Sequence, residues 1–349
     1  MAEEGDLLHV VTDDDISSRR MALGTALVWG SAGIVGLSFA VVWMAKAGMI
    51  GVGVAEVMRN GEQGKRTLFV LPAVLFVIAM VIFPLIFALG IAFSDWNLAS
   101  PDGRQFNGWD NMRQMWNDPF YWNALKNMVY YTAAILVEYA IAFGLALILA
   151  SEIRARKFFR VAFLMPLMLS PVAVSWMIGK SMMEIRFGPL ARLARELGWD
   201  NPSFFGSPEV ARLMIMAMDA WTFIPFMMIM LLAGLQAIPR ELNEAAEVDG
   251  AGKWRSFWEV TFPLMLPVSI TAILIRIIFK LKLADIIINV TSGGPGGATD
   301  SVTSFIFREY RDRSNVGYGT LLAIVYLVLI VIAITVFMKL ASRWMNPRY

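Results

Sequence analysis

Four ionisable side chains stand inside long apolar stretches of this 349-residue chain: Glu138, Asp219, Arg276 and Lys280. An ionised group in hydrocarbon costs several kcal/mol unless it faces water or an opposite charge, so each is a candidate for function. Arg276 and Lys280 are four residues apart and share one helix face. Either they contact a solute carrying a phosphate, sulfonate or carboxylate, or Glu138 and Asp219 neutralise them in buried ion pairs. The sequence leaves both open.

Groups that could perform catalysis or hold a metal are scarce. The chain has no cysteine, which excludes thiol nucleophiles and Cys-ligated metals, and its one histidine, His9, lies in an acidic leader. The string Gly179-Lys180-Ser181 has Val174 where a phosphate-binding loop needs its first glycine. The glycine-rich run 293–297 is better explained as a flexible turn. We expect no catalytic residue, metal site or cofactor in this chain.

Trp221 could stack on a sugar ring, although packing against lipid or the protein core is the favoured explanation for an aromatic residue there.

A short surface helix is predicted between residues 239 and 250. Pro239 suits a first helical turn, and Gly250 is typical of a left-handed C-terminal cap. Small side chains would let another protein approach closely, and acids could pair with its basic groups. This helix offers both, with Ala245 and Ala246 flanked by Glu244, Glu247 and Asp249. A second short helix should follow, placing Trp254, Phe257 and Trp258 at a lipid interface.

The composition places these residues in a membrane. The chain is 58% hydrophobic and 17% charged, against roughly 25% charged in soluble domains. A bilayer core needs about 20 mainly apolar residues per helix. We therefore predict an all-α polytopic bundle, whose six-helix core has spans near 66–93, 125–150, 161–182, 211–236, 264–290 and 319–341.

Loop charge predicts the orientation. With the loop 151–160 on the cytoplasmic side, the inside segments hold 14 Lys and Arg residues in 73, and the outside segments hold 8 in 87. Arg19, Arg20 and the basic residues after Met58 then also favour the inside. The apolar segment between them should cross twice, which favours eight spans; seven spans with an outside N-terminus is the alternative. The net charge of +2 gives no reason to expect a nucleic-acid partner.

The loop that contains the surface helix resembles the EAA signature of ABC-importer permeases. The matching residues are Glu244-Ala245-Ala246, Gly250, Val260, Phe262 and Pro263, and the fuller sugar-permease form adds Asp249-Gly250-Ala251, Phe257 and Pro267. Segments from Phe106, Trp221 and Asn289 are also similar to carbohydrate permeases. The maltose-transporter large subunit is the most similar type, but the loop 94–124 is too short for its large periplasmic domain.

The resemblance implies a permease of the bacterial cytoplasmic (inner) membrane that imports a sugar, polyol or related organic solute. It implies a second permease subunit, two ATPase subunits that bind ATP and Mg, and an extracytoplasmic solute-binding protein. The ATPases would dock on Glu244, Ala245, Ala246, Asp249, Gly250, Ala251 and Pro263. Aligned with the maltose subunit, Arg276 and Lys280 fall on the sugar path.

These interpretations divide the chain into a cytoplasmic leader 1–20, a membrane hairpin 21–60 and a permease core 61–349 with the coupling loop 237–262. A secondary transporter with a complete pore in one chain is the main alternative, but it should show two similar halves, and we find no convincing internal repeat. A membrane-embedded enzyme is a second alternative, which lacks a recognisable catalytic group.

Overall fold

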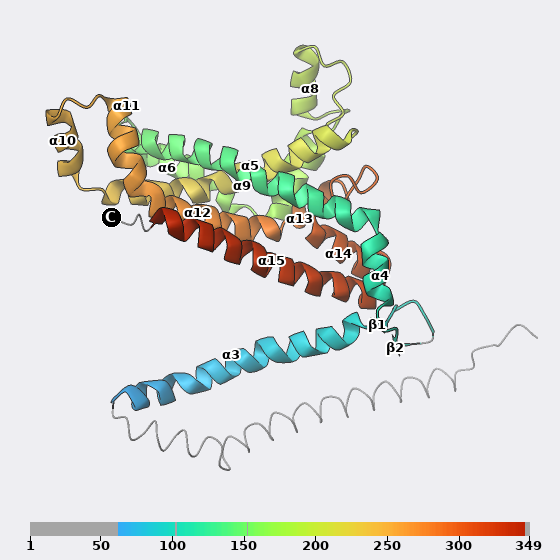
Figure 1. Ribbon diagram of the computed structural model, residues 1–349. Coiled ribbons are helices and arrows are strands. Elements are labelled where there is room, and N and C mark those ends of the chain that lie inside the picture. The colour runs from blue at the N-terminus through green and yellow to red at the C-terminus, as the bar shows by residue number, and fades with distance from the viewer. Residues whose placement is uncertain (1–61, 102, 152, 346–349) are drawn as a thin grey trace, which may run out of the picture. The chain divides into compact units, whose positions relative to one another are not determined.

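The computed structural model describes residues 62–101, 103–151 and 153–345 (Figure 1). The predicted leader 1–20 and hairpin 21–60 lie outside the described residues, so the number of crossings there stays a prediction. The first described helix is α3 (Glu62–Ala92). The chain divides into two compact units after Pro84, within this helix, and the bundle described below belongs to the second unit.

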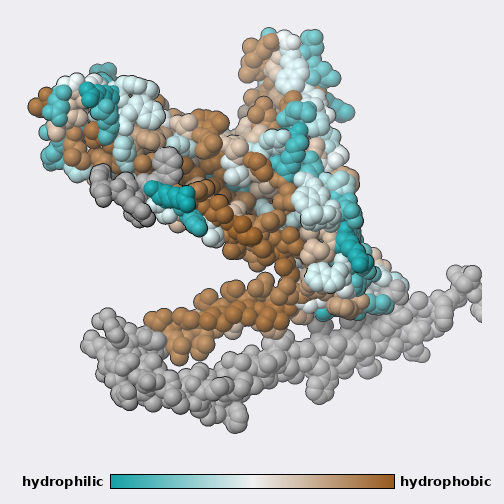
Figure 2. All heavy atoms as spheres, viewed as in Figure 1, coloured by the Kyte–Doolittle hydropathy of each residue, from teal (hydrophilic) through white to brown (hydrophobic). Residues whose placement is uncertain are grey.

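Four long helices build the bundle in this second unit (Figure 1). They are α5 (Pro119–Ala150), α9 (Pro208–Ala237), α12 (Phe262–Leu281) and α15 (Val316–Met345). Helices α5 and α9 pack along each other, and α12 lies against both. Side chains such as Ile135, Met228 and Met265 interlock there with almost no exposed surface. Apolar residues cover the bundle between hydrophilic ends (Figure 2), as expected for a membrane protein.

Shorter elements lie around the long helices. One group comprises a strand pair, β1 (Ser94–Asp95) and β2 (Gln105–Phe106), followed by α4 (Asp110–Asn117), α8 (Pro189–Glu196), α13 (Asp285–Val290) and α14 (Val302–Arg311). The other comprises α6 (Arg156–Leu164), α10 (Arg240–Val248) and α11 (Lys253–Ser256), where α5 and α9 end and α12 begins.

Within the described residues, five helices are long and apolar enough to cross a membrane, or six if a bent pair counts as one span. The expected span 161–182 is that bent pair: α6 with its 3-10 extension to Met168, then α7 (Pro171–Val174) with a π-helical extension to Met182, at 94°. The bend has a local cause. Ser170 is extended, as a residue before proline prefers, and its hydroxyl caps the next helix at Ala173 N, 3.2 Å away.

The expected span 264–290 also differs, because α12 ends at Leu281 and α13 forms separately. Two side chains from other helices donate hydrogen bonds to the Leu281 carbonyl oxygen: Tyr326 Oη at 2.8 Å and Thr303 Oγ1 at 3.0 Å. Ser301 Oγ donates to the Leu283 carbonyl. These long-range partners satisfy the carbonyls that the chain exposes when the helix stops.

A glycine contact gives a test of this packing. A Cβ at Gly317 in α15 would lie 2.0 Å from the Ser94 carbonyl oxygen, which is backbone and cannot rotate away, whereas a Cβ at Gly144 in α5 would meet nothing within 4 Å. We expect Gly317→Ala to lose at least about 2 kcal/mol of stability through steric overlap. Gly144→Ala should be neutral or stabilise by up to about 1 kcal/mol. Thermal unfolding followed by tryptophan fluorescence in detergent measures both, and equal melting temperatures would contradict the close contact.

Candidate functional site

The four ionisable residues inside the bundle meet in one cluster. Glu138 comes from α5, Asp219 from α9, and Arg276 and Lys280 from α12. Arg276 Nε lies 2.7 Å from Glu138 Oε2, and Lys280 Nζ lies 2.7 Å from Glu138 Oε1. Asp219 Oδ2 also pairs with Arg276 Nη2 and Lys280 Nζ. Each carboxylate therefore contacts both cations, and the cluster has no net formal charge.

Burial makes this pairing necessary. The side chains of Arg276 and Lys280 are 0% exposed and those of Glu138 and Asp219 are 2% exposed. The ion-pair alternative from the sequence is thus what the structure shows. The Arg276 guanidinium also lies over the Phe223 ring, 4.5 Å from its centroid, while its Nη1 has no hydrogen-bond partner. Charge and ring contacts together tie α5 and α9 to the last turns of α12.

Trp221 does not join the cluster. It is 39% exposed and lines a separate apolar pocket of about 470 Å³ with Phe163 and Pro166. Asp219 and Trp221 are two residues apart on α9, which places them on different faces of the helix.

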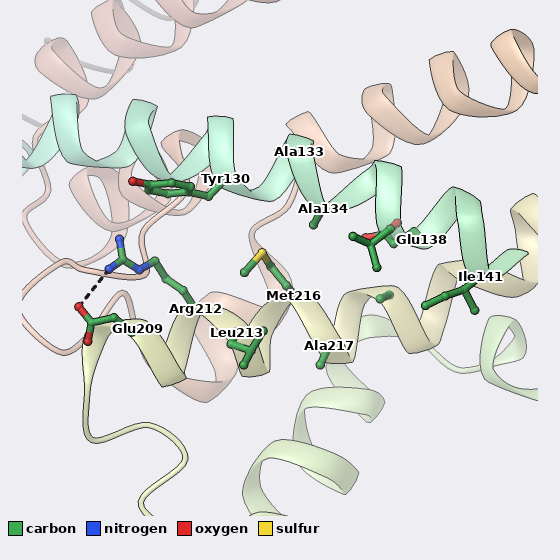
Figure 3. Close-up of a pocket in the computed structure, with 12 residues that line it drawn as sticks. Tyr130, Ala133, Ala134, Glu138, Ile141, Glu209, Arg212, Leu213, Met216 and Ala217 are labelled. Atoms are coloured by element: carbon green, nitrogen blue, oxygen red, sulfur yellow. Dashed lines mark ion pairs between the residues drawn. The ribbon is translucent and has the colours of Figure 1, made fainter.

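A groove of about 760 Å³ runs between α5 and α9 (Figure 3). Ala133, Ala134 and Ala217 give it a small-residue lining, and Glu138 lies along it. Arg212 and Glu209 form an ion pair at its other end, 3.6 Å apart. Within this groove, Glu138 links the buried cluster to an accessible surface.

The end of the glycine-rich run and the two residues after it, 297–299, are held by hydrogen bonds that our interpretation as a flexible turn missed. Asn123 Nδ2 donates to Gly297 O at 2.8 Å, Asn127 Nδ2 to Ala298 O at 2.7 Å, and Tyr131 Oη to Thr299 O at 2.7 Å. The three donors are spaced four residues apart on one face of α5. This spacing in the sequence indicates a polar stripe along the helix, but no local pattern shows which loop the three side chains would bind.

Asp300 follows this loop and is buried with Arg308, whose Nη2 lies 2.9 Å from Asp300 Oδ2. Ser304 Oγ donates to Asp300 Oδ1 at 2.9 Å. Burial raises the pKa of Asp300 to about 6, although the neighbouring Arg308 and the Ser304 hydrogen bond act in the opposite direction. Desolvation therefore outweighs both favourable contacts.

The surface helix α10 forms where the sequence predicts it. Gly250 has φ +78°, its N–H donates to Glu247 O at 3.0 Å, and Ala251 N–H donates to Ala246 O at 2.9 Å. These two bonds define a Schellman motif, which ends the helix and satisfies its last carbonyls. Glu244, Ala245, Glu247 and Asp249 are exposed, whereas Ala246 is buried.

The second short helix is not separate from the span that follows it. α11 continues through a π-helical segment (Phe257–Thr261) into α12, so that Lys253–Leu281 forms one span and Pro263 lies in the first turn of α12. Proline lacks the N–H of a regular turn, which suits a wider π segment at this point. Trp254 and Trp258 are exposed, whereas Phe257, which the sequence groups with them, is partly buried against Phe143. Among the described residues, no group of three or more His, Cys, Asp or Glu side chains could hold a metal ion.

Comparison with known proteins gives consistent matches. Residues 140–349 match the family described as "Binding-protein-dependent transport system inner membrane component". The chain is 32% identical to the sulfoquinovosyl glycerol transport system permease protein SmoG of Agrobacterium fabrum, over 80% of this chain and 91% of that protein. It is 31% identical to the trehalose/maltose transport system permease protein MalF of Thermococcus litoralis, over 78% and 92%.

The fold matches that of a chain in the crystal structure of a bacterial alginate ABC transporter in complex with an alginate pentasaccharide-bound periplasmic protein. The TM-score is 0.69 at 21% identity, covering 80% of this chain and 96% of that chain.

Removing one charge from the buried cluster should be costly. We expect Lys280→Met to lose about 3–5 kcal/mol, because a carboxylate stays buried without its cation. Asp219→Asn should recover part of that loss when combined with Lys280→Met, since it restores neutrality. As a control, Arg255→Gln removes an exposed pair with Glu259 and should cost less than about 1 kcal/mol. Unfolding in sodium dodecyl sulfate, followed by tryptophan fluorescence, measures each; additive effects of the two cluster substitutions would contradict the coupling.

The raised pKa of Asp300 predicts a pH dependence. Because its ordinary value of 3.8 rises to about 6 in the folded chain, protonation stabilises the fold, and this contribution is lost as pH rises from about 4 through 6. The difference in stability between the wild type and Asp300→Asn should change by up to about 3 kcal/mol across that range. Asp312→Asn is the control, because Asp312 is more exposed and Arg311 holds its pKa below the ordinary value. Parallel pH profiles for the wild type and Asp300→Asn would contradict the assignment.

Proposed function

The chain belongs to the family of binding-protein-dependent transport system inner membrane components, and on this premise we propose that it is the permease subunit of an ATP-driven importer. The membership confirms the resemblance read from the loop around Glu244 and Gly250. Family membership and the several long apolar helices together identify the chain as a multi-pass membrane protein. The location proposed is the bacterial cytoplasmic membrane.

The observation that carries this proposal is the exposed α10 helix between two spans. Its exposed acids and Ala245 present a nearly flat, negatively charged surface, and the Schellman motif at Gly250 fixes where the helix ends. Such a surface suits a rigid contact with a basic groove on a separate ATPase. We propose that Glu244, Ala245, Ala246, Asp249, Gly250, Ala251 and Pro263 form or support this contact.

The mechanism follows from how α10 is connected. The chain leaves α9 at Ala237, forms α10 at Arg240–Val248 and enters the next span at Lys253. A force on α10 therefore acts on α9 and α12, the two helices that carry Asp219, Arg276 and Lys280. We infer that closure of two ATPase subunits, each binding ATP and Mg, moves these helices together and alternates the access of the pore, which a second permease subunit completes.

The proposed solute is a sugar, polyol or related organic molecule delivered by an extracytoplasmic binding protein. The relatives named for trehalose/maltose and for sulfoquinovosyl glycerol transport support this class. We assign the solute path to the groove between α5 and α9 beside Glu138. Arg276 and Lys280 are neutralised and unexposed here, so their charges alone give no preference for an anionic solute.

Two glycines near the end of α10 allow a matched test. Gly250 has φ +78° and Gly252 has φ −67°, and a Cβ at either meets nothing within 4 Å. Gly250→Ala should cost about 1–2 kcal/mol through backbone strain and weaken assembly several-fold, whereas Gly252→Ala should leave assembly unchanged. Glu244→Lys should abolish assembly, because it places a positive charge against the basic groove of the ATPase. Glu259→Lys is the control, because it makes the same charge reversal outside α10. Co-purification of the ATPase subunits and ATP hydrolysis in proteoliposomes measure the effect.

Two results would count against the proposal. Unchanged assembly and energised hydrolysis in both Gly250→Ala and Glu244→Lys would remove α10 from the mechanism. Active transport by the chain alone, without ATPase subunits, would instead support a secondary transporter.

A further inference from the structure

Four cations gather where the bent membrane segment begins. Arg154 precedes α6, and Arg156, Lys157 and Arg160 lie within its first two turns. Among the described residues, none of the four forms an ion pair with a carboxylate. This contrasts with the buried cluster inside the bundle, where every charge has an opposite partner. The α6 end of the bundle therefore carries positive charge that the described chain does not neutralise.

Two of these arginines converge on a single neutral acceptor. With the Gln236 amide oxygen turned toward them, that oxygen accepts from Arg156 Nη2 at 2.7 Å and from Arg160 Nη2 at 2.5 Å. Each guanidinium has five N–H donors, so the two groups together offer more donors than one shared carbonyl can accept. A phosphate with several acceptor oxygens can take further donors from both.

The helix itself adds to the positive potential. No acidic residue lies in the first turn of α6, and no side chain caps it, since Ala155 occupies the cap position with φ +60°. Cations are normally unfavourable at a helix N-terminus, where the backbone dipole is already positive. An anion from outside the chain would offset both contributions.

Apolar side chains on the same helix indicate where that anion comes from. Phe158 is 67% exposed and Val161 is 66% exposed, and the helix leads directly into the membrane segment that bends before Pro171. Exposed aromatic and aliphatic groups beside a basic cluster are typical of a surface that inserts between lipid headgroups. A soluble phosphate would gain nothing from these apolar neighbours.

We propose that Arg156 and Arg160, with Arg154 and Lys157, form a binding site for the phosphate headgroup of an anionic glycerophospholipid. The site ties α6 to the last turn of α9 through Gln236, four residues before the surface helix α10 begins at Arg240. An anionic lipid bound here stiffens the connection through which a force on α10 reaches the bundle.

The test uses the full-length chain purified in a neutral detergent. Short-chain phosphatidylglycerol and phosphatidylcholine of equal chain length are titrated, and native mass spectrometry counts the bound lipid. Phosphatidylglycerol should bind in preference, and Arg156→Gln/Arg160→Gln should weaken it about 25-fold, because each cation near an anionic lipid contributes about 1 kcal/mol. Lys339→Gln/Arg343→Gln, which removes two exposed cations from the last turns of α15, should change the affinity less than about threefold.

A second variant separates lipid binding from folding. Gln236→Glu places a carboxylate between the two guanidinium groups, so it should raise the melting temperature while abolishing the preference for phosphatidylglycerol. Equal binding of the two lipids, or full phosphatidylglycerol binding by Arg156→Gln/Arg160→Gln, would overturn the proposal. Equal stabilisation by inorganic phosphate would also overturn it, because that result assigns the cluster to a soluble anion. If Arg156→Gln/Arg160→Gln lost a co-purifying protein but bound lipid unchanged, the cluster would belong to a protein partner instead.

Discussion

The requirement that a buried charge find an opposite charge governs the centre of this protein. Removing a carboxylate or an ammonium group from water costs several kcal/mol, which only close pairing offsets. Glu138, Asp219, Arg276 and Lys280 meet this requirement together, since each carboxylate contacts both cations. The relative positions of α5, α9 and α12 are thereby restricted, because sliding one helix by a turn would leave charges unpaired in an apolar interior.

Backbone polar groups impose the same requirement at the helix ends. Where α12 stops, Tyr326, Thr303 and Ser301 take the freed carbonyls; where α7 begins, Ser170 caps the first turn. Residues 297–299, at the end of the glycine-rich run, are likewise fixed by amide and hydroxyl donors from α5. In an apolar environment such groups have no water to bond to, so each needs a partner within the protein, which is near in sequence for Ser170 and distant for Tyr326.

The proposed transport function depends on the contrast between this paired interior and the unpaired ends. The interior is neutral and tied across three helices, so a displacement at one end moves these helices as a body. The ends keep exposed charge of opposite sign: acids on α10, and cations on α6 beside Gln236. The acids of α10 suit a protein partner with a basic surface, and the cations of α6 suit the anionic surface of a lipid bilayer. The two sites can therefore lie at the same end of the bundle without competing for one partner.

The sequence by itself determined the membrane class, most of the long helices and the surface helix ending at Gly250, because apolar length, proline and glycine act locally. It also identified the four charged residues and offered ion pairing as one of two explanations. Only the tertiary structure decided between these, since Glu138 and Arg276 are 138 residues apart. It also decided the stop at Leu281 and the attachment of residues 297–299 to α5. Each depends on which distant side chain reaches a given group, and that follows from packing rather than local pattern.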